Sequence, residues 1–144
     1  MAIQRQKQSK TLFLGDSCLD EYIFGECTRL SPEAPVPVVL HKSTKTIKGM
    51  ASNAVENFKN VSGNPVKFLT NNPEEIKKVR FVDNKSNYQI MRYDFEKTLD
   101  PIKKKDLPEE EFDVVVISDY NKGFVSNEIV SEIRKKYSNA KIFV

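Results

Sequence analysis

The sequence of 144 residues has little cysteine and histidine: Cys18, Cys27 and His41 are the only residues of these two types. Three such side chains are too few for a Cys/His metal site, and a catalytic triad would have a single histidine available. Two cysteines also do not build the framework of a disulfide-rich secreted domain. The composition therefore disfavours zinc proteins, triad hydrolases and small disulfide-bonded proteins.

Long apolar runs, a secretory signal peptide and the glycine-rich phosphate-binding motifs are also missing. No stretch approaches the roughly 18 apolar residues of a membrane-spanning helix, so we expect no membrane partner and a reduced, cytoplasmic setting. Neither a Walker A nor a Rossmann glycine pattern occurs. The net charge is only +3, with basic and acidic residues interleaved, so we expect no nucleic-acid partner.

Two short apolar runs each end in acidic residues. Residues 12–14 are followed by Gly15, Asp16 and, slightly later, Asp20; residues 114–117 are followed by Ser118 and Asp119. Such runs predict buried parallel strands, and ligands of open α/β sheets bind outside the carboxyl ends of the strands. If the two strands are parallel neighbours, the three aspartates converge on one edge of the sheet, which is our candidate site.

Two segments carry apolar residues at helical spacing. The first spans residues 51–61, with Ser52 or Asn53 able to cap its start. The second spans residues 127–137 and has Ser126 as its cap. The predicted inward faces consist of Ala51, Ala54, Val55, Phe58 and Val61 in the first helix and of Ile129, Val130, Ile133 and Tyr137 in the second.

The remaining pattern predicts short strands at residues 41–47, 66–69, 76–82, 87–95 and 141–144. Alternation in 76–82 and 87–95 indicates one solvated face, so this hairpin is expected off the main sheet. Prolines at positions 32, 35 and 37 exclude a helix or a central strand there and suit an edge strand or a lid. The element order predicts an α/β sheet with a separate small β layer.

Four residues near the predicted strand and helix ends have two interpretations. Asp16 and Asp20 could accept hydrogen bonds from sugar hydroxyls, or they could be ordinary turn and cap residues. Gly49 and Asn53 stand where the first helix starts. Exposed backbone N–H groups there could hold an anion or a hydroxyl, or they could simply form a helix N-terminus.

Each of the remaining candidate residues also has both a functional and a structural interpretation. Asp119 and Lys122 directly follow a buried strand, and Lys122 could neutralise a phosphate, or the segment could be a surface turn. Arg29 and Arg92 could clamp a phosphate, although a lone arginine is more often solvated. Cys18 favours a packing role over a nucleophilic one, because no histidine is near it in sequence.

Five motifs occur in a fixed order along residues 11–144: G-D-S-C-L-D at 15–20, T-R-L-S-P-E-A-P-V-P-V-V at 28–39, G-M-A-S-N at 49–53, M-R-Y-D-F-E at 91–96 and S-D-Y-N-K-G at 118–123. Together they resemble the amino-terminal part of a ribokinase/PfkB-type carbohydrate kinase. Within that family they are most similar to the D-glycero-β-D-manno-heptose 7-phosphate kinase domain.

The resemblance implies a ribokinase-like (Rossmann-like) parallel α/β sheet with helices and a small β lid. We expect a disordered tail at residues 1–10 and one shortened domain at 11–144, with lid segments at about 22–47 and 78–95. The family transfers a phosphoryl group from ATP to a sugar hydroxyl. The substrate-binding positions that the resemblance implies are Asp16, Cys18, Asp20, Gly49, Asn53, Arg92, Asp119 and Lys122.

Three departures from the family pattern bear on function. Met50 stands where the family usually has a second glycine, and residues 70–75 replace a further helix and strand. The G-A-G-D motif, which supplies the family's catalytic aspartate and anion hole, does not occur in these 144 residues. ATP and Mg²⁺ are therefore implied by the family while the region that binds them is missing, and we assign no catalytic or metal-binding residue.

These observations predict a shortened sugar-kinase-like protein that keeps a sugar-phosphate half-site and is not catalytic alone. We expect a homodimer through the β lid and a sugar phosphate as the ligand, with heptose 7-phosphate as the candidate that the resemblance implies. Two alternatives stay open. The protein could be a non-catalytic dimeric interaction module, or it could be a split fragment of a PfkB-family kinase.

Overall fold

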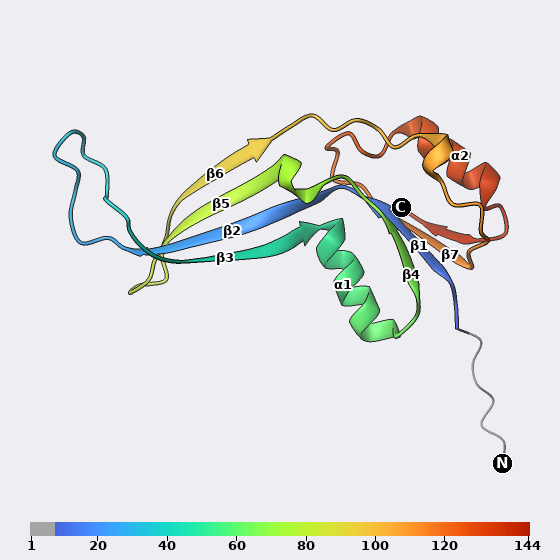
Figure 1. The fold of residues 1–144 in the computed structure, drawn as a ribbon, viewed down its shortest axis with the longest axis horizontal. Helices are drawn as coiled ribbons and strands as arrows, with labels where there is room; N and C mark the ends of the chain where they lie inside the picture. Colours follow the sequence, from blue (N-terminus) through green and yellow to red (C-terminus); the bar gives the residue numbers. More distant parts are fainter. Residues whose placement is uncertain (1–7) are drawn as a thin grey trace, which may run out of the picture. The chain divides into compact units, whose positions relative to one another are not determined.

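The computed structural model describes residues 8–144, which form two compact units (Figure 1). Unit 1 contains the described residues up to Ser17 together with Met50–Asn72 and Thr98–Val144, and unit 2 contains Cys18–Gly49 and Pro73–Lys97. The predicted lid segments, 22–47 and 78–95, fall within unit 2. Most of the predicted disordered tail, namely residues 1–7, lies outside the described residues.

Unit 1 is built on a four-stranded sheet in the order β4-β1-β7-β8, in which every pairing is parallel. Its strands are β1 (Thr11–Gly15), β4 (Val66–Leu69), β7 (Val114–Ser118) and β8 (Lys141–Phe143). Continuous apolar runs are typical of such sheets, because both faces are covered. The prediction that the first and second apolar runs are parallel neighbours is confirmed, with Gly15 opposite Ser118.

Helices α1 (Ala51–Ser62) and α2 (Asn127–Lys136) lie on opposite sides of this sheet (Figure 1). The Phe58 ring of α1 packs on Phe13 of β1, with 5.4 Å between ring centroids. Tyr137, at the end of α2, meets the edge of Phe112 and donates a hydrogen bond to the Pro108 carbonyl at 2.7 Å. Burial of a large apolar side chain such as Phe13 or Phe112 stabilises the fold by about 1.5–3 kcal/mol.

The caps of the two helices differ in their agreement with the prediction. The Ser126 hydroxyl accepts a hydrogen bond from the Ile129 N–H, so the predicted cap of α2 is confirmed. The predicted caps of α1 are wrong, because Met50 occupies the N-cap position without a side-chain hydrogen bond. Ser52 is instead within 2.7 Å of the Ser17 hydroxyl, and Asn53 is exposed.

The prediction that Val61 lies on the inward face of α1 is wrong. Its side chain is 90% exposed. A helix turns about 100° per residue, so Val61 lies about 60° back around the helix from Phe58, at the margin of the apolar stripe. The helix then ends at Gly63, which has φ 62° and donates its N–H to the Lys59 carbonyl.

Unit 2 contains a second four-stranded sheet in the order β3-β2-β5-β6, so the prediction of a hairpin off the main sheet is confirmed. Its strands are β2 (Ser17–Glu26), β3 (Leu40–Met50), β5 (Ile76–Asp83) and β6 (Gln89–Glu96). Strand β2 runs parallel to β5, and β5 is antiparallel to β6. Two short 3₁₀ turns, Pro73–Glu75 and Lys104–Asp106, complete the elements.

The prediction that Asp20 lies in a turn beyond the first strand is corrected by the structure. Only Asp16 separates β1 from β2, and Asp20 lies inside β2, opposite Lys78 of β5. The reason is that pairing with β3 and β5 on both sides keeps this segment extended, which overrides the local turn preference of aspartate.

The proline-rich segment between β2 and β3 forms no strand beyond one bridge between Leu30 and Pro37. This agrees with the exclusion of a helix and a central strand by its prolines. Neither α-helix within residues 8–144 has the length and apolar character needed to span a membrane.

Met50 generates the first testable prediction. Its φ of 55° and ψ of −132° form a backbone conformation that glycine adopts easily and that costs other residues about 1–3 kcal/mol. We expect Met50→Gly to be more stable than Met50→Ala by about 1 kcal/mol or more in urea unfolding followed by circular dichroism.

Asn57, which is exposed in the middle of α1, is the matched control. There Gly should be less stable than Ala by about 0.5–1 kcal/mol, the usual order inside a helix. The same order at both positions would contradict the strain that we assign to Met50.

Candidate functional site

In unit 1, the loop after β7 is held by the carboxylate of Asp16. Asp16 is fully buried, and its Oδ2 accepts hydrogen bonds from the N–H groups of Tyr120 at 2.7 Å and Lys122 at 3.3 Å. Its Oδ1 accepts a third from the Phe124 N–H at 3.2 Å. Its backbone carbonyl accepts the Ala51 N–H at 3.0 Å. One residue therefore fixes both the 119–124 loop and the start of α1.

The electrostatics of Asp16 follow from this burial. Burial raises the pKa of the Asp16 carboxyl above its usual value, and Asp119 adds to this, while the three backbone N–H donors act in the opposite direction. Gly15 is required beside it, because a Cβ there would overlap the Ser118 carbonyl oxygen. The predicted strand-end residues Asp16 and Asp119 thus lie near each other in unit 1.

A buried polar network, which no sequence pattern indicated, joins the ends of β1 and β4 to α1. The Ser17 N–H donates to Asn71 Oδ1 at 2.7 Å, and Asn71 Nδ2 donates to the Ser17 carbonyl at 3.1 Å. Thr70 Oγ1 donates to Ser17 Oγ at 2.6 Å, and Ser17 Oγ is 2.7 Å from Ser52 Oγ. Thr70 and Asn71, the first two residues of the short 70–75 connection, therefore hold Ser17 in place through hydrogen bonds.

In unit 2, charged residues gather on one face of the sheet. Side chains two residues apart share a face, and the register places Tyr22 opposite Arg80 and Arg80 opposite Arg92. The neighbouring row places Asp20, Lys78 and Asp94 opposite one another in the same way. We call the six residues the charged face: Asp20, Tyr22, Lys78, Arg80, Arg92 and Asp94.

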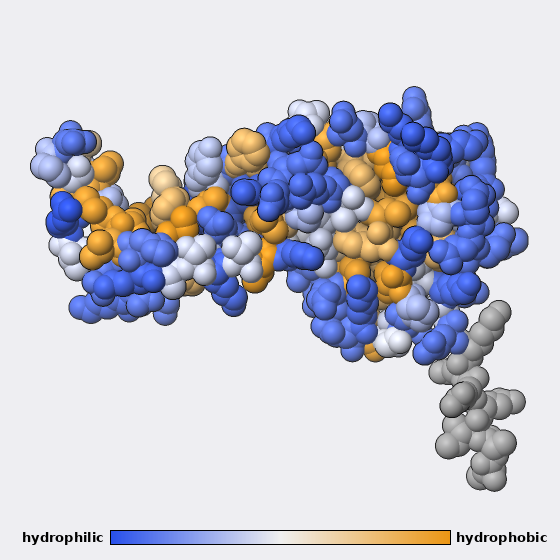
Figure 2. Space-filling model, viewed as in Figure 1, coloured by the Kyte–Doolittle hydropathy of each residue, from blue (hydrophilic) through white to orange (hydrophobic). Residues whose placement is uncertain are grey.

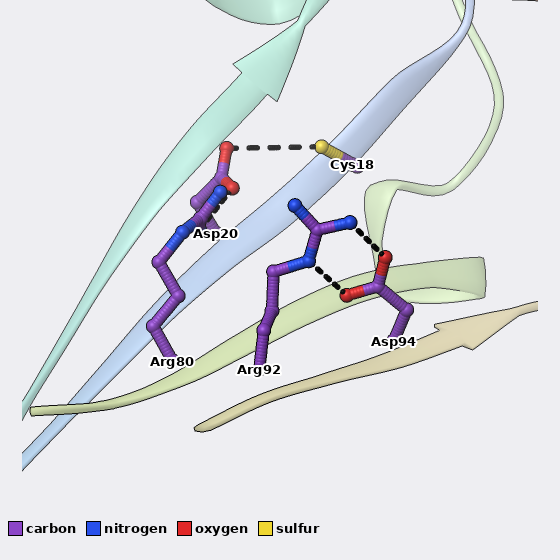
Figure 3. Close-up of polar contacts among 5 residues, drawn as sticks. All are labelled: Cys18, Asp20, Arg80, Arg92 and Asp94. Atoms are coloured by element: carbon purple, nitrogen blue, oxygen red, sulfur yellow. Dashed lines mark hydrogen bonds and ion pairs between the residues drawn. The ribbon is translucent and has the colours of Figure 1, made fainter. Parts of the chain in front are cut away.

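An ion pair between Asp20 and Arg80 is the tightest contact of the charged face (Figure 3). Arg80 Nη1 donates to Asp20 Oδ1 at 2.6 Å, and the two side chains are only 19% and 17% exposed. The Arg80 guanidinium also lies over the Tyr22 ring, 5.0 Å from its centroid. The hydrogen bond to Asp20 raises the pKa of Arg80 further, so this arginine stays charged.

The second oxygen of Asp20 faces Cys18 and Gly49. The Cys18 thiol donates to Oδ2 at 3.9 Å, and a Cβ at Gly49 would overlap Oδ2 and lie 2.7 Å from the Cys18 sulfur. Glycine is therefore needed at position 49, so that the backbone of β3 can approach the carboxylate. Burial raises the pKa of the Cys18 thiol, with a smaller effect of Asp20, which favours packing over nucleophilic chemistry.

Arg92 forms its own ion pair with Asp94 on the same strand (Figure 3). Nε donates to Oδ1 and Nη2 to Oδ2, both at 2.8 Å, which is the two-bond geometry that arginine also uses for phosphate. Like charges opposite each other destabilise a sheet unless they are compensated. Arg80 and Arg92 are opposite each other, and each is compensated by its own carboxylate.

The structure divides the predicted site residues into two groups. Unit 1 holds Asp16, Asn53, Asp119 and Lys122, whereas unit 2 holds Cys18, Asp20, Gly49 and Arg92. Sequence reasoning missed Tyr22, Lys78 and Arg80. Lys78 and Arg80 are two residues apart, as are Arg92 and Asp94. This period-two spacing of charged residues is a sequence signal from which the charged face could have been predicted. Arg29 lies exposed in the proline-rich segment and is not part of the charged face.

The known proteins that the sequence matches include two relatives with the same name. The sequence is 30% identical over 168 residues to the bifunctional protein HldE of a Nitratiruptor species. It is 32% identical over 149 residues to that of Haemophilus influenzae (strain PittEE). The matches cover 94% and 81% of this chain but only 36% and 31% of the relatives. The chain thus spans about a third of their length.

Solved structures identify the fold. A putative phosphofructokinase from Staphylococcus aureus has a TM-score of 0.51 at 10% identity, over 92% of this chain and 51% of that one. The tetrameric inhibited form of phosphofructokinase-2 from Escherichia coli has a TM-score of 0.50 at 11% identity, over 94% of this chain and 54% of that one. At such identities the likeness concerns the fold alone.

This chain resembles the amino-terminal part of HldE and has a ribokinase-like fold. The expectation of a ribokinase/PfkB-type sequence on a parallel α/β sheet is therefore confirmed. No protein-family model matches the sequence.

The Asp16 contacts generate the second prediction. In Asp16→Asn an NH₂ group replaces one of the two acceptor oxygens, so at least one of the three loop N–H groups loses its partner. We expect a loss of about 1–3 kcal/mol of unfolding free energy, measured in urea. Hydrogen exchange at the amides of Tyr120, Lys122 and Phe124 should accelerate in the same variant.

Asp119→Asn is the matched control for that substitution. Asp119 is exposed, and its Oδ1 accepts one hydrogen bond, from the Asn121 N–H at 2.7 Å, which an amide oxygen can also accept. Its unfolding free energy should stay within about 0.5 kcal/mol of the wild type. Equal stability of the two variants would contradict the role of Asp16 as the holder of the loop.

Proposed function

We propose that the charged face of unit 2 binds a phosphorylated sugar. The observation that carries the proposal is the pair of arginines, Arg80 and Arg92, directly opposite each other on β5 and β6 and next to Asp20. Guanidinium groups recognise phosphate through paired hydrogen bonds, and an ionised carboxylate accepts hydrogen bonds from sugar hydroxyls. One face therefore offers both chemistries that a sugar phosphate needs.

The family resemblance narrows the ligand to a heptose phosphate. The sequence resembles HldE and, by its motifs, the heptose 7-phosphate kinase domain. In unit 1, Asn53, Asp119 and Lys122 stay proposed sugar-phosphate ligands on the strength of the motifs alone. Asp16 would act on them indirectly, since it holds the loop that carries Asp119 and Lys122.

We propose binding without phosphoryl transfer for these 144 residues. Phosphoryl transfer depends on positioned groups that stabilise charge around the phosphorus. The G-A-G-D motif that supplies them in the family does not occur in this sequence. We do not assign this role to Asp119, whose Oδ1 accepts a hydrogen bond from the Asn121 N–H in its own loop.

Isothermal titration calorimetry with heptose 7-phosphate tests the proposal, with ATP–Mg²⁺ as a parallel titrant. We expect the sugar phosphate to bind and ATP–Mg²⁺ not to bind. Asp20→Asn should weaken sugar-phosphate binding about tenfold or more, because a hydrogen bond to a charged group contributes about 1.5–3 kcal/mol. The matched acid-to-amide control is Glu56→Gln, on the exposed face of α1, which should bind as the wild type does.

Two results would refute this function. The first is a wild-type chain that binds no sugar phosphate, and the second is an Asp20→Asn variant that binds as tightly as the wild type. ADP release from ATP in the presence of heptose 7-phosphate, lost in Asp20→Asn, would instead show that the chain is catalytic.

A second candidate function, an interaction module, is favoured by the opposite face of the same sheet. Met91, Tyr93 and Phe95 of β6 alternate with the charged residues and are 52%, 56% and 47% exposed. Phe81 and Val79 of β5 lie opposite Met91 and Tyr93. Hydrophobic side chains are visible on the surface of unit 2 in Figure 2. Contiguous exposed apolar residues of this kind mark interaction sites.

We call the apolar side chains of this face of β5 and β6 the apolar row. We infer that two copies of the chain form a dimer through this apolar row. Light scattering after size exclusion should give the mass of a dimer at high micromolar concentration. Tyr93→Lys places a charge in the centre of the row and should give a monomer. Val61→Lys changes an apolar residue that is 90% exposed on α1 and should leave the dimer intact.

A wild-type monomer under these conditions would exclude the homodimer. A dimer that binds no sugar phosphate would favour the interaction module over the binding site. If the chain is a monomer that binds the sugar phosphate only together with the remaining two thirds of an HldE relative, the split-fragment alternative would be favoured.

A further inference from the structure

Both oxygens of the Asp20 carboxylate are already occupied within unit 2. Oδ1 accepts a hydrogen bond from Arg80 at 2.6 Å. Oδ2 faces the Cys18 thiol and the backbone of Gly49, where there is no room even for a methyl group. The Asp20 side chain is only 17% exposed. Arg80 therefore takes up one acceptor position of Oδ1 and, with the low exposure of the side chain, restricts the approach of a sugar hydroxyl to it.

Of the three groups around the Asp20 carboxylate, Arg80 is the one that can move. Gly49 is backbone and Cys18 is buried, whereas Arg80 is a long side chain whose guanidinium rests on the half-buried Tyr22 ring. A guanidinium that leaves a carboxylate needs another anion to remain compensated. Arg92, directly opposite Arg80 on β6, marks where a phosphate could engage both arginines together.

We propose that the Asp20–Arg80 ion pair is a gate, in which a phosphate group that engages Arg80 releases the Asp20 carboxylate for sugar hydroxyls. This inference rests on the proposed sugar-phosphate function and adds a rule of specificity to it. Anion binding and hydroxyl binding are coupled through one shared arginine. Lys78, opposite Asp20 on β5, supplies a positive charge close to the released carboxylate.

The gate predicts that a neutral sugar binds poorly because it cannot displace Arg80. Coupling between two ligands is reciprocal, so inorganic phosphate should tighten the binding of a neutral sugar, and the sugar should tighten the binding of phosphate. Arg92 differs from Arg80 in this respect. Its partner is Asp94, so its loss weakens the phosphate site without releasing Asp20.

Calorimetry with three probes tests the gate: heptose 7-phosphate, the unphosphorylated heptose and inorganic phosphate. In the wild type, saturating phosphate should tighten heptose binding about fivefold or more. In Arg80→Gln, heptose should bind about that much tighter than to the wild type without phosphate, and phosphate should add nothing. Arg134→Gln, at an exposed position of α2 in unit 1, is the matched control, and its binding of heptose and its response to phosphate should equal those of the wild type.

Tyr22→Leu provides a second variant should Arg80→Gln fail to fold. It removes the aromatic ring on which the Arg80 guanidinium rests, so Arg80 should leave Asp20 more easily and heptose should bind tighter than to the wild type. Unchanged or weaker heptose binding in the folded variants would refute the gate. If heptose 7-phosphate still binds the wild type and not Asp20→Asn, the proposed function stands without the gate. If heptose 7-phosphate does not bind the wild type, both fail.

Discussion

The buried carboxylate of Asp16 is the interaction on which unit 1 depends. Three backbone N–H groups of the 119–124 loop point at its two oxygens, and its carbonyl fixes the first residue of α1. A buried carboxylate is stable only when such donors replace water. The absence of a side chain at Gly15 lets β1 approach Ser118 closely enough for this contact. The end of β1 thus organises the loop that follows β7.

Unit 2 compensates its charges in a different way, by pairing side chains across one face of a sheet. Asp20 and Asp94 neutralise Arg80 and Arg92, which would otherwise repel each other across adjacent strands. The Arg92–Asp94 pair is partly exposed and contributes little to stability, whereas the Asp20–Arg80 pair is largely shielded from solvent. Under the proposed gate, Arg80 leaves Asp20 when a phosphate binds, while Asp94 remains the partner of Arg92.

Most strands and both helices could be predicted, because apolar spacing reports burial directly. The residues that escaped prediction depend on partners far away in sequence. Asp20 looked like a turn residue, since nothing local shows that β2 pairs with β5. Arg80 was missed because its importance appears only in the register with Tyr22 and Arg92. Met50 takes the N-cap position in place of the predicted Ser52 or Asn53, and it does so at a positive φ.

The side-chain NMR signals of Arg80 and Arg92 test the central claim most directly. In a chain labelled with ¹⁵N, the Nε–H resonances of both arginines should shift together when heptose 7-phosphate is added and should stay unchanged when unphosphorylated heptose is added at the same concentration. Such a result would place the phosphate on the charged face of unit 2. Saturation with the sugar phosphate that leaves both resonances in place would contradict the account.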